Sequence, residues 1–152
     1  MSQVMLKNEA KDRPYYFPQG LAGFASAHEF GFIYEGKGDL VCMQSVDQME
    51  AAFILAQWDI KRLGNPPELS DDQLNCLHLT REKLQSTDHV MWMLVLNPFA
   101  DTKWVTANIR APIIINLEAR RGVQCIRHDA EYPLRYHWMA QPEVQKKAAV
   151  MA

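Results

Sequence analysis

Apolar and polar residues alternate most regularly at positions 105–110, where the sequence reads Val-Thr-Ala-Asn-Ile-Arg. A period of two is typical of a β-strand that buries one face, so we expect a strand here with its apolar residues facing the core. Asn108 and Arg110 would then lie on the polar face of this strand, where side chains are available for binding.

Two further strands are expected directly after this one. Pro112 stands where a proline is tolerated, at the start of a strand, and the β-branched residues Ile113–Ile115 favour extended structure. Arg121-Gly122 indicates a turn, because glycine accepts a positive φ angle at little steric cost. Val123–Arg127 then resumes the extended pattern, so the region is predicted to form a β-meander.

The preceding part of the chain has the same β-rich character. Runs of aromatic and β-branched residues, bounded by glycine, proline and aspartate, predict strands at residues 15–17, 30–35, 40–46, 51–56 and 88–97. Gly36 and Gly38 predict a tight turn that joins two of them into a hairpin. In the loop at residues 19–24, Leu21 and Phe24 either plug one end of the sheet, which we prefer, or face a partner.

The clearest helix start in the sequence lies at Ser70, after the chain-breaking sequence Asn-Pro-Pro. Ser70 and Gln73 have the spacing of a capping box, and Leu69 and Leu74 have that of a hydrophobic staple. Thr80 can cap a second short helix that ends near residue 85. Helices this short depend on packing, so we expect the leucines of this region to be buried.

These elements predict a mostly β protein, with an antiparallel, small β-barrel-like or sandwich fold and two short helices inserted around residues 70–86. Two short helices cannot cover about seven strands, so the sheet is expected to close on itself or to fold into two layers. Residues 1–140 form a single domain in this interpretation, and residues 141–152 form a C-terminal tail. The chain beyond Tyr136 is predicted to be an appendage, and residues 1–14 to be mobile or an edge strand.

The composition is that of an ordinary globular domain, with 152 residues of which 48% are hydrophobic and 22% charged. No apolar run approaches the length of a membrane span, about 20 residues, and the N-terminal residues lack a signal-peptide pattern. We therefore expect a cytoplasmic protein without a membrane partner. Cys42, Cys76 and Cys125 are too scattered for a metal-ligand cluster and odd in number for a disulfide framework, so all three are expected in the core.

Charge is unevenly distributed along the chain. Between Asp39 and Asp101 there are ten acidic and four basic residues, a net charge of −6, although the whole chain carries only −2. An acidic surface repels nucleic acid and attracts basic proteins. The alternative interpretation is a solvated face without a specific role.

The sequence contains no nucleophile elbow, phosphate-binding loop or dinucleotide motif, so it indicates no catalytic site and no cofactor. The segment His128–Glu131 is the densest group of potential metal ligands, but its spacing does not require a metal. RNA binding by a small barrel that stacks bases on Trp104 and Tyr132 is disfavoured, because the chain is close to neutral and its middle is acidic.

The remaining interpretation is a module that binds other proteins. Arginine, tyrosine and tryptophan dominate the binding energy of protein interfaces, and they gather around the predicted meander. We predict partner-binding residues at Asn108, Arg110, Tyr132, Arg135 and Tyr136, and we expect Asn108→Ala and Arg135→Ala to weaken partner binding with little effect on thermal stability. In the alternative interpretation these aromatic residues cap the core and the arginines are solvated.

Four motifs in sequence order resemble those of the FliW family of flagellar assembly factors. They are FPQGLAGF from Phe17, MQSVDQMEAAFIL from Met43, ELSDDQL from Glu68, and TANIRAPIIINLEARRGVQCI from Thr106 with YPLRY from Tyr132. The resemblance covers roughly residues 17–136. The sequence departs from the family pattern at Ala22, where proline is usual, and in a longer tail after Arg135.

The resemblance implies a small cytoplasmic β-barrel-like protein without catalytic activity, cofactor or metal. It implies two protein partners, which are flagellin and CsrA, the RNA-binding repressor of flagellin translation. The two would exchange on the protein, which would then act as a flagellin chaperone and a regulator of translation without binding nucleic acid itself. The alternative is a small β-barrel that binds nucleic acid or a ligand outside motility.

Overall fold

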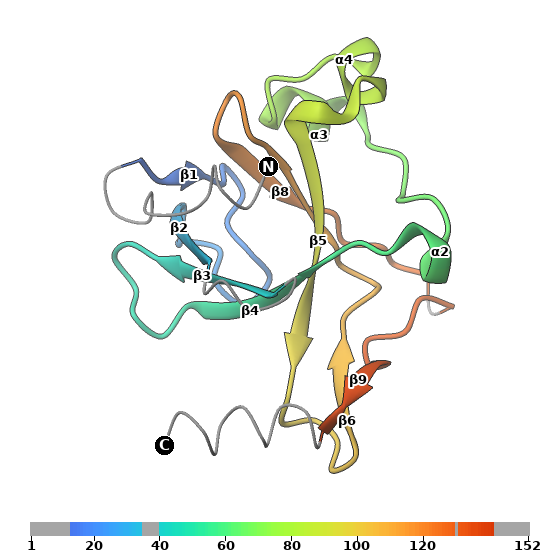
Figure 1. Ribbon diagram of the computed structural model, residues 1–152. Helices are drawn as coiled ribbons and strands as arrows, with labels where there is room; N and C mark the ends of the chain where they lie inside the picture. The colour runs from blue at the N-terminus through green and yellow to red at the C-terminus, as the bar shows by residue number, and fades with distance from the viewer. Residues whose placement is uncertain (1–12, 35–39, 130, 142–152) are drawn as a thin grey trace.

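The computed structural model describes residues 13–34, 40–129 and 131–141, most of which lie in β-strands or the turns between them (Figure 1). The strands are β1 (Tyr15–Tyr16), β2 (Glu29–Tyr34), β3 (Leu40–Ser45), β4 (Ala52–Gln57), β5 (Val90–Asn97), β6 (Trp104–Ala107), β7 (Ile113–Asn116), β8 (Arg121–Gln124) and β9 (Tyr136–Ala140). The helices are α2 (Ile60–Leu63), α3 (Asp71–Cys76), α4 (Arg81–Gln85) and the 3-10 helix η1 (Thr87–His89).

Seven strands close into a barrel in the order β4-β3-β2-β1-β8-β7-β5, because β5 also pairs with β4. Among the described strands every pairing is antiparallel except β1 with β8. Of the two predicted architectures, the structure therefore has the barrel, which leaves none of these seven strands as a long open edge.

Strand β5 is the longest strand and runs across the whole molecule (Figure 1). One edge pairs with β4 over Met93–Leu96. The other edge is divided between two strands. Val90–Met93 pairs with β7, which belongs to the barrel wall, and Leu96–Asn97 pairs with β6, which lies outside the barrel. Strand β9 adds to the far side of β6 and is the last strand in the sheet order.

The barrel is filled by large apolar side chains. Edge-to-face aromatic pairs line its interior, with ring centroids 5.0 Å apart for Tyr15 and Phe32 and 5.2 Å apart for Phe17 and Phe30. Leu21 is buried in this cluster and Phe24 packs against it, which confirms the prediction that this loop plugs the sheet. The interior cluster consists of Tyr15, Phe17, Leu21, Ala27, Phe30, Phe32, Val41, Met43, Ala51, Leu55, Met91, Met93, Ile113, Ile115 and Leu117.

Two outer layers cover parts of the barrel surface. Leucines from α3 and its flanking loops, Leu69, Leu74, Leu77 and Leu79, pack on Ile114, Val123 and Cys125 of β7, β8 and the residue after β8. Strands β6 and β9 pack with α2 on the outward side chains Ala56, Leu94 and Leu96 of β4 and β5. Strand β7 is therefore buried on both faces, which explains its run of isoleucines.

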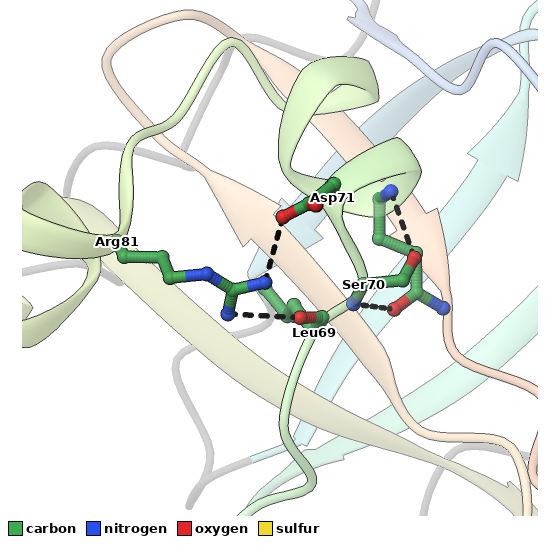
Figure 2. Close-up of polar contacts among 5 residues, drawn as sticks. Leu69, Ser70, Asp71 and Arg81 are labelled. Carbon is green, nitrogen blue, oxygen red and sulfur yellow. Dashed lines mark hydrogen bonds and ion pairs between the residues drawn. The ribbon is translucent and has the colours of Figure 1, made fainter.

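The helical layer begins with the predicted capping box. The Ser70 hydroxyl accepts the backbone N–H of Gln73 at 3.1 Å, and the Gln73 side chain accepts the backbone N–H of Ser70 at 2.9 Å. Arg81 joins the two helices, because its guanidinium donates to the Leu69 carbonyl at 3.1 Å and to Asp71 at 2.8 Å (Figure 2). Thr80 caps α4 as predicted. The exposed Arg81–Asp71 pair positions the helices more than it stabilises them.

Asn116 connects the helical layer to the barrel. Its side-chain amide donates to the Leu77 carbonyl at 2.9 Å, and its carbonyl oxygen accepts the backbone N–H groups of Glu118 and Ala119. The residue is only 4% exposed. The preference for a structural role of Asn116 over a binding role is consistent with these bonds.

The prediction of a turn at Arg121-Gly122 is wrong, because both residues lie in β8. The turn comes earlier, at residues 117–120, where Arg120 adopts φ +57°. Gly122 is required for a different reason: a Cβ there would overlap the ring of Phe17. Strand β8 also ends at Gln124, short of the predicted Arg127.

Other predictions need correction near the C-terminus and in the first half. Strand β6 ends at Ala107, before Asn108, and residues 137–140 belong to β9, so this described part of the chain is not an appendage. Helix α2 was not predicted. Of the three cysteines only Cys125 is fully buried, since Cys42 and Cys76 are partly exposed. The predictions for residues 1–12, the turn at 35–39 and the tail after 141 fall outside the described residues.

We expect Asn116→Ala to lower the free energy of unfolding by about 2–3 kcal/mol, because it leaves a buried carbonyl and two backbone N–H groups without partners. Chemical denaturation measures this loss. Asn75→Ala, at an exposed position of the same helical layer, is the matched control and should change stability by less than about 0.5 kcal/mol. Equal effects of the two substitutions would contradict a connecting role for Asn116.

Candidate protein-binding surface

Asn108 directs the chain out of β6. Its side-chain oxygen accepts the backbone N–H of Arg110 at 3.0 Å and that of Ala111 at 3.2 Å. This is an Asx turn, in which the side chain takes the place of a backbone acceptor. Asn108 is half-buried and its acceptor oxygen is already used within the chain. The structure therefore gives Asn108 a role in shaping the loop at residues 108–111.

A second loop, at residues 127–133, lies against the first. The Arg110 side chain donates to the Tyr132 carbonyl at 2.8 Å, and the Ile109 backbone N–H donates to the Pro133 carbonyl at 3.1 Å. In the opposite direction, Arg127 donates from its backbone to the Arg110 carbonyl at 2.8 Å and from its guanidinium to the Ile109 carbonyl at 2.5 Å. These bonds hold two loops together that are distant in sequence.

The junction of the two loops presents a cation stacked on an aromatic ring. The Arg127 guanidinium carbon lies 3.6 Å from the ring centroid of Tyr132 and 5.9 Å from that of Trp58. Contacts of this kind are electrostatically favourable, because the ring face attracts the cation. Tyr132 stays 36% exposed beside this arginine.

Helix α2 supplies the arginine of a second cation–aromatic group, and strand β9 supplies its aromatic rings. Arg62 lies 4.1 Å from the ring centroid of Trp138 and 5.3 Å from that of Tyr136, and it donates to the His137 carbonyl at 3.1 Å. Asp59 positions this short helix by accepting the backbone N–H groups of Lys61 and Arg62. Local capping at the helix start therefore places Arg62 over β9.

A groove lies between α2 and β9, with a volume of about 570 Å³. We call it the α2–β9 groove, and we call the partly exposed arginine and aromatic side chains in and beside it the aromatic–arginine surface. The groove is lined by Leu40, Ala56, Gln57, Trp58, Asp59, Ile60, Lys61, Arg62, Trp138 and Met139. The aromatic–arginine surface consists of Trp58, Arg62, Arg127, Tyr132, Tyr136 and Trp138.

The structure brings some of the predicted binding residues together. Arg110 contacts the backbone of Tyr132, and Tyr136 lies under Arg62 at the edge of the same surface. Arg135 is exposed and has no hydrogen bond or ion pair with any described residue. Trp58 and Arg62 were missed by the sequence analysis. Their sequence shows only that an aromatic residue and an arginine lie close together. It contains no pattern that would place these two residues beside β9.

Most cations of this region lack a carboxylate partner. Within the described ranges, Lys61, Arg62, Arg127 and Arg135 form no ion pair. The nearby carboxylates are held by backbone groups, since Asp59 caps α2 and Asp129 accepts the N–H of Glu131. These carboxylates keep their charge, but the four cations outnumber Asp59, Asp129 and Glu131, so the rim has a small excess of positive charge around apolar walls. The whole chain, in contrast, has a negative net charge.

Cys125 lies near this surface but is not a reactive thiol. Burial raises the pKa of Cys125 to about 12, and the positive charge of Arg127 opposes this shift only in part. A buried thiol with a raised pKa stays protonated and unreactive near neutral pH. This agrees with the expectation that Cys125 belongs to the core.

The described part of the chain was also predicted to hold no metal site and no membrane-spanning segment. No group of three histidine, cysteine, aspartate or glutamate side chains there is arranged to hold a metal ion, and this includes the described residues of His128–Glu131. No described helix is long and apolar enough to cross a membrane.

Comparison with known proteins connects this architecture to one family. The family model described as "FliW protein" matches residues 3–138. "Flagellar assembly factor FliW" of Leptospira biflexa is 33% identical over 120 residues, which cover 78% of this chain and 76% of that protein. The protein of the same description from Caldicellulosiruptor bescii is 31% identical over 123 residues, covering 80% and 77%.

A solved structure agrees with the fold as well. A crystal structure described as that of the flagellar assembly factor FliW superposes with a TM-score of 0.67 at 26% sequence identity. The match covers 82% of this chain and 84% of the other. The seven strands of the barrel lie within the matched length of the family model, which ends at Trp138, inside β9.

The bonds of Asn108 change what its substitution should do. We expect Asn108→Ala to lower the free energy of unfolding by about 1–2 kcal/mol, because two backbone N–H groups lose their acceptor, so the expectation of unchanged thermal stability does not hold for this residue. Arg135→Ala is the matched control and should stay within about 0.5 kcal/mol of the parent. Thermal or denaturant unfolding of both variants tests this, and an unaffected Asn108→Ala protein would refute the Asx-turn role.

We expect Cys125 to resist alkylation by iodoacetamide at pH 8 in the folded protein. Its folded-state pKa is about 12, whereas an unfolded thiol has a pKa of about 8.5, so the folded form keeps its proton until the pH is far higher. The stability from this raised pKa is present below about pH 8.5 and is lost as the pH rises toward 12. Mass spectrometry after short labelling should show modified Cys42 and Cys76 first, and Cys125 only after denaturant is added.

Proposed function

The chain belongs to the FliW family of flagellar assembly factors, and from that premise we propose that it binds flagellin and the translational repressor CsrA in alternation. While flagellin accumulates in the cytoplasm, it occupies this protein. Once flagellin is exported, the released protein binds CsrA outside its RNA site and relieves the repression of flagellin synthesis. The protein acts in this scheme as a cytoplasmic chaperone and regulator without catalysing a reaction.

The observation that carries this proposal is the family match over residues 3–138, which spans the barrel and the aromatic–arginine surface together. The character of that surface supports a protein partner. Arginine, tyrosine and tryptophan are the residues enriched at the centres of protein interfaces, and here they are held in place by hydrogen bonds between loops. A surface ordered before binding loses little conformational entropy when a partner docks.

The helical layer supports a basic partner such as CsrA. Its exposed acidic residues are Glu68, Asp71, Asp72, Glu82 and Asp88, against exposed Arg81 and Lys83. The layer lies at the start of β5, away from β6 and β9 at its other end (Figure 1). A concentration of one charge sign accelerates the encounter with a surface of opposite sign, and salt reduces the effect.

The test of partner exchange is a competition between purified proteins. CsrA immobilised on a sensor should capture this protein, and added flagellin should release it in proportion to the flagellin concentration. A protein that binds neither partner would refute the proposed function. Simultaneous retention of both partners at saturating concentrations would refute the exchange while leaving the two interactions in place.

We expect the association rate with CsrA to fall by at least about tenfold between low salt and 0.5 M salt, because charge steering is screened. The double variant Glu68→Lys/Asp88→Lys should associate several-fold more slowly at low salt. Glu29→Lys/Glu50→Lys changes the net charge equally at exposed sites outside the helical layer and is the matched control. Equal rates for the two double variants in stopped-flow measurements would show that the helical layer does not steer CsrA.

A further inference from the structure

We propose that the α2–β9 groove binds an extended acidic segment of another protein. An apolar side chain of the segment would lie against Trp58 and Trp138, and its carboxylates would pair with Lys61 and Arg62. The proposal goes beyond the exchange of flagellin and CsrA, because it assigns a ligand chemistry to the groove whichever protein supplies the segment.

The walls of the groove suit an apolar side chain. Leu40 and Ala56 form its floor on β3 and β4, and Trp58, Trp138 and Met139 border it. Ile60, on α2, is 59% exposed at the rim, which is an unfavourable position for isoleucine in water. The volume of about 570 Å³ lies within the usual range of ligand pockets and exceeds the space that one side chain needs.

The groove is also ordered in advance. The Trp58 indole N–H donates to the Gly64 carbonyl at 2.8 Å, which fixes the ring beside α2. Arg62 is fixed by the His137 carbonyl and by the face of Trp138. The hydrogen bond from Arg62 to His137 therefore connects α2 with β9, the two walls of the groove, although these residues are 75 positions apart in the sequence. A ligand does not have to order the walls when it binds.

The charge at the rim selects the ligand. Lys61 and Arg62 are exposed and form no ion pair with described residues, while the one carboxylate that lines the groove, that of Asp59, accepts hydrogen bonds from the start of α2. The rim thus offers two cations to an incoming anion. Charge-assisted bonds from these groups to Asp or Glu side chains would be stronger than bonds to neutral acceptors.

The sheet favours an extended ligand. Strand β9 is the last strand of the sheet order and pairs only with β6 among the described strands. Trp138 and Met139 of this strand line the groove, so a segment lying there runs beside a strand edge. Addition of a strand to such an edge is a common way for a protein to bind a peptide, with pockets that select alternate side chains.

Single-stranded nucleic acid is the competing occupant, since aromatic rings beside arginines can stack bases. Two observations favour the peptide. Arg62 already covers the ring of Trp138, which leaves that face closed to a base. The whole chain has a net charge of −2, and the helical layer is acidic, both of which repel a polyanion at long range.

The first experiment pans a phage-displayed library of random nonapeptides against the purified full chain. We expect enriched sequences that combine a large apolar residue with two or more aspartates or glutamates. A fluorescein-labelled synthetic peptide of the enriched sequence is then titrated by anisotropy. A library without enrichment, or an enriched basic sequence, would overturn the proposal.

Substitutions then locate the binding site of the peptide. Arg62→Glu should weaken its binding at least tenfold, and Ile60→Asp, at an exposed position whose change leaves the core intact, should do the same. Lys83→Glu makes the same charge reversal on the exposed face of α4 and is the matched control, for which we expect less than a twofold change. Circular dichroism confirms that each variant is folded, and unchanged affinity in both groove variants would refute the assignment.

A labelled 12-nucleotide oligouridylate is titrated in parallel, and we expect no saturable binding below 100 µM. Binding of this RNA that is lost in Arg62→Glu would overturn the proposal in favour of nucleic acid. The peptide measurements contain neither flagellin nor CsrA. A peptide that binds the groove while both proteins fail to bind the chain would therefore refute only the proposed exchange, and the reverse result would refute only the groove assignment.

Discussion

The architecture depends on the way in which β5 divides one of its edges between two strands. Its first half hydrogen-bonds to β7 and so closes the barrel, and its last residues hydrogen-bond to β6. Strand β6 pairs on its other side with β9, and these two strands form an outer flap that packs on the outer side chains of β4 and β5. The α2–β9 groove exists only where this outer flap meets α2. A backbone pairing inside the sheet thus produces the surface for which we propose a binding role.

The loop that joins the barrel to the flap shows how one set of residues serves both fold and surface. Asn108 turns the chain after β6, and Arg110 and Arg127 hold the loops at residues 108–111 and 127–133 together through backbone carbonyls. A change in this network would displace Tyr132 as well as weaken the barrel. Partner-binding defects of variants in these loops are therefore informative only beside a measurement of stability, whereas Arg135 has no such double role.

Features that depend on local spacing could be predicted from the sequence, and features that depend on distant contacts could not. The capping box of Ser70 and Gln73 can be recognised because the two residues are only three positions apart. Strands such as β5 can be recognised from their apolar, β-branched and aromatic composition. Gly122 was misread as a turn residue because its true requirement is the ring of Phe17, more than a hundred positions away. The groove between α2 and β9 depends on the contacts of Arg62 with His137 and Trp138, for which the sequence has no periodic signal.

Lys61 and Arg62 at the α2–β9 groove form no ion pair with described residues, and the proposed binding role explains this better than stability does. An exposed ion pair contributes about 0–1 kcal/mol to folding, so leaving Lys61 and Arg62 without carboxylates sacrifices little in the isolated protein. When a partner excludes water, the same charges interact in a medium of lower effective dielectric constant, and a matching carboxylate is worth more there. A mismatched cation would instead be left buried without a counter-charge. In the proposed complex, the groove would therefore discriminate between partners by the sign of their charge while the barrel beneath it stays unchanged.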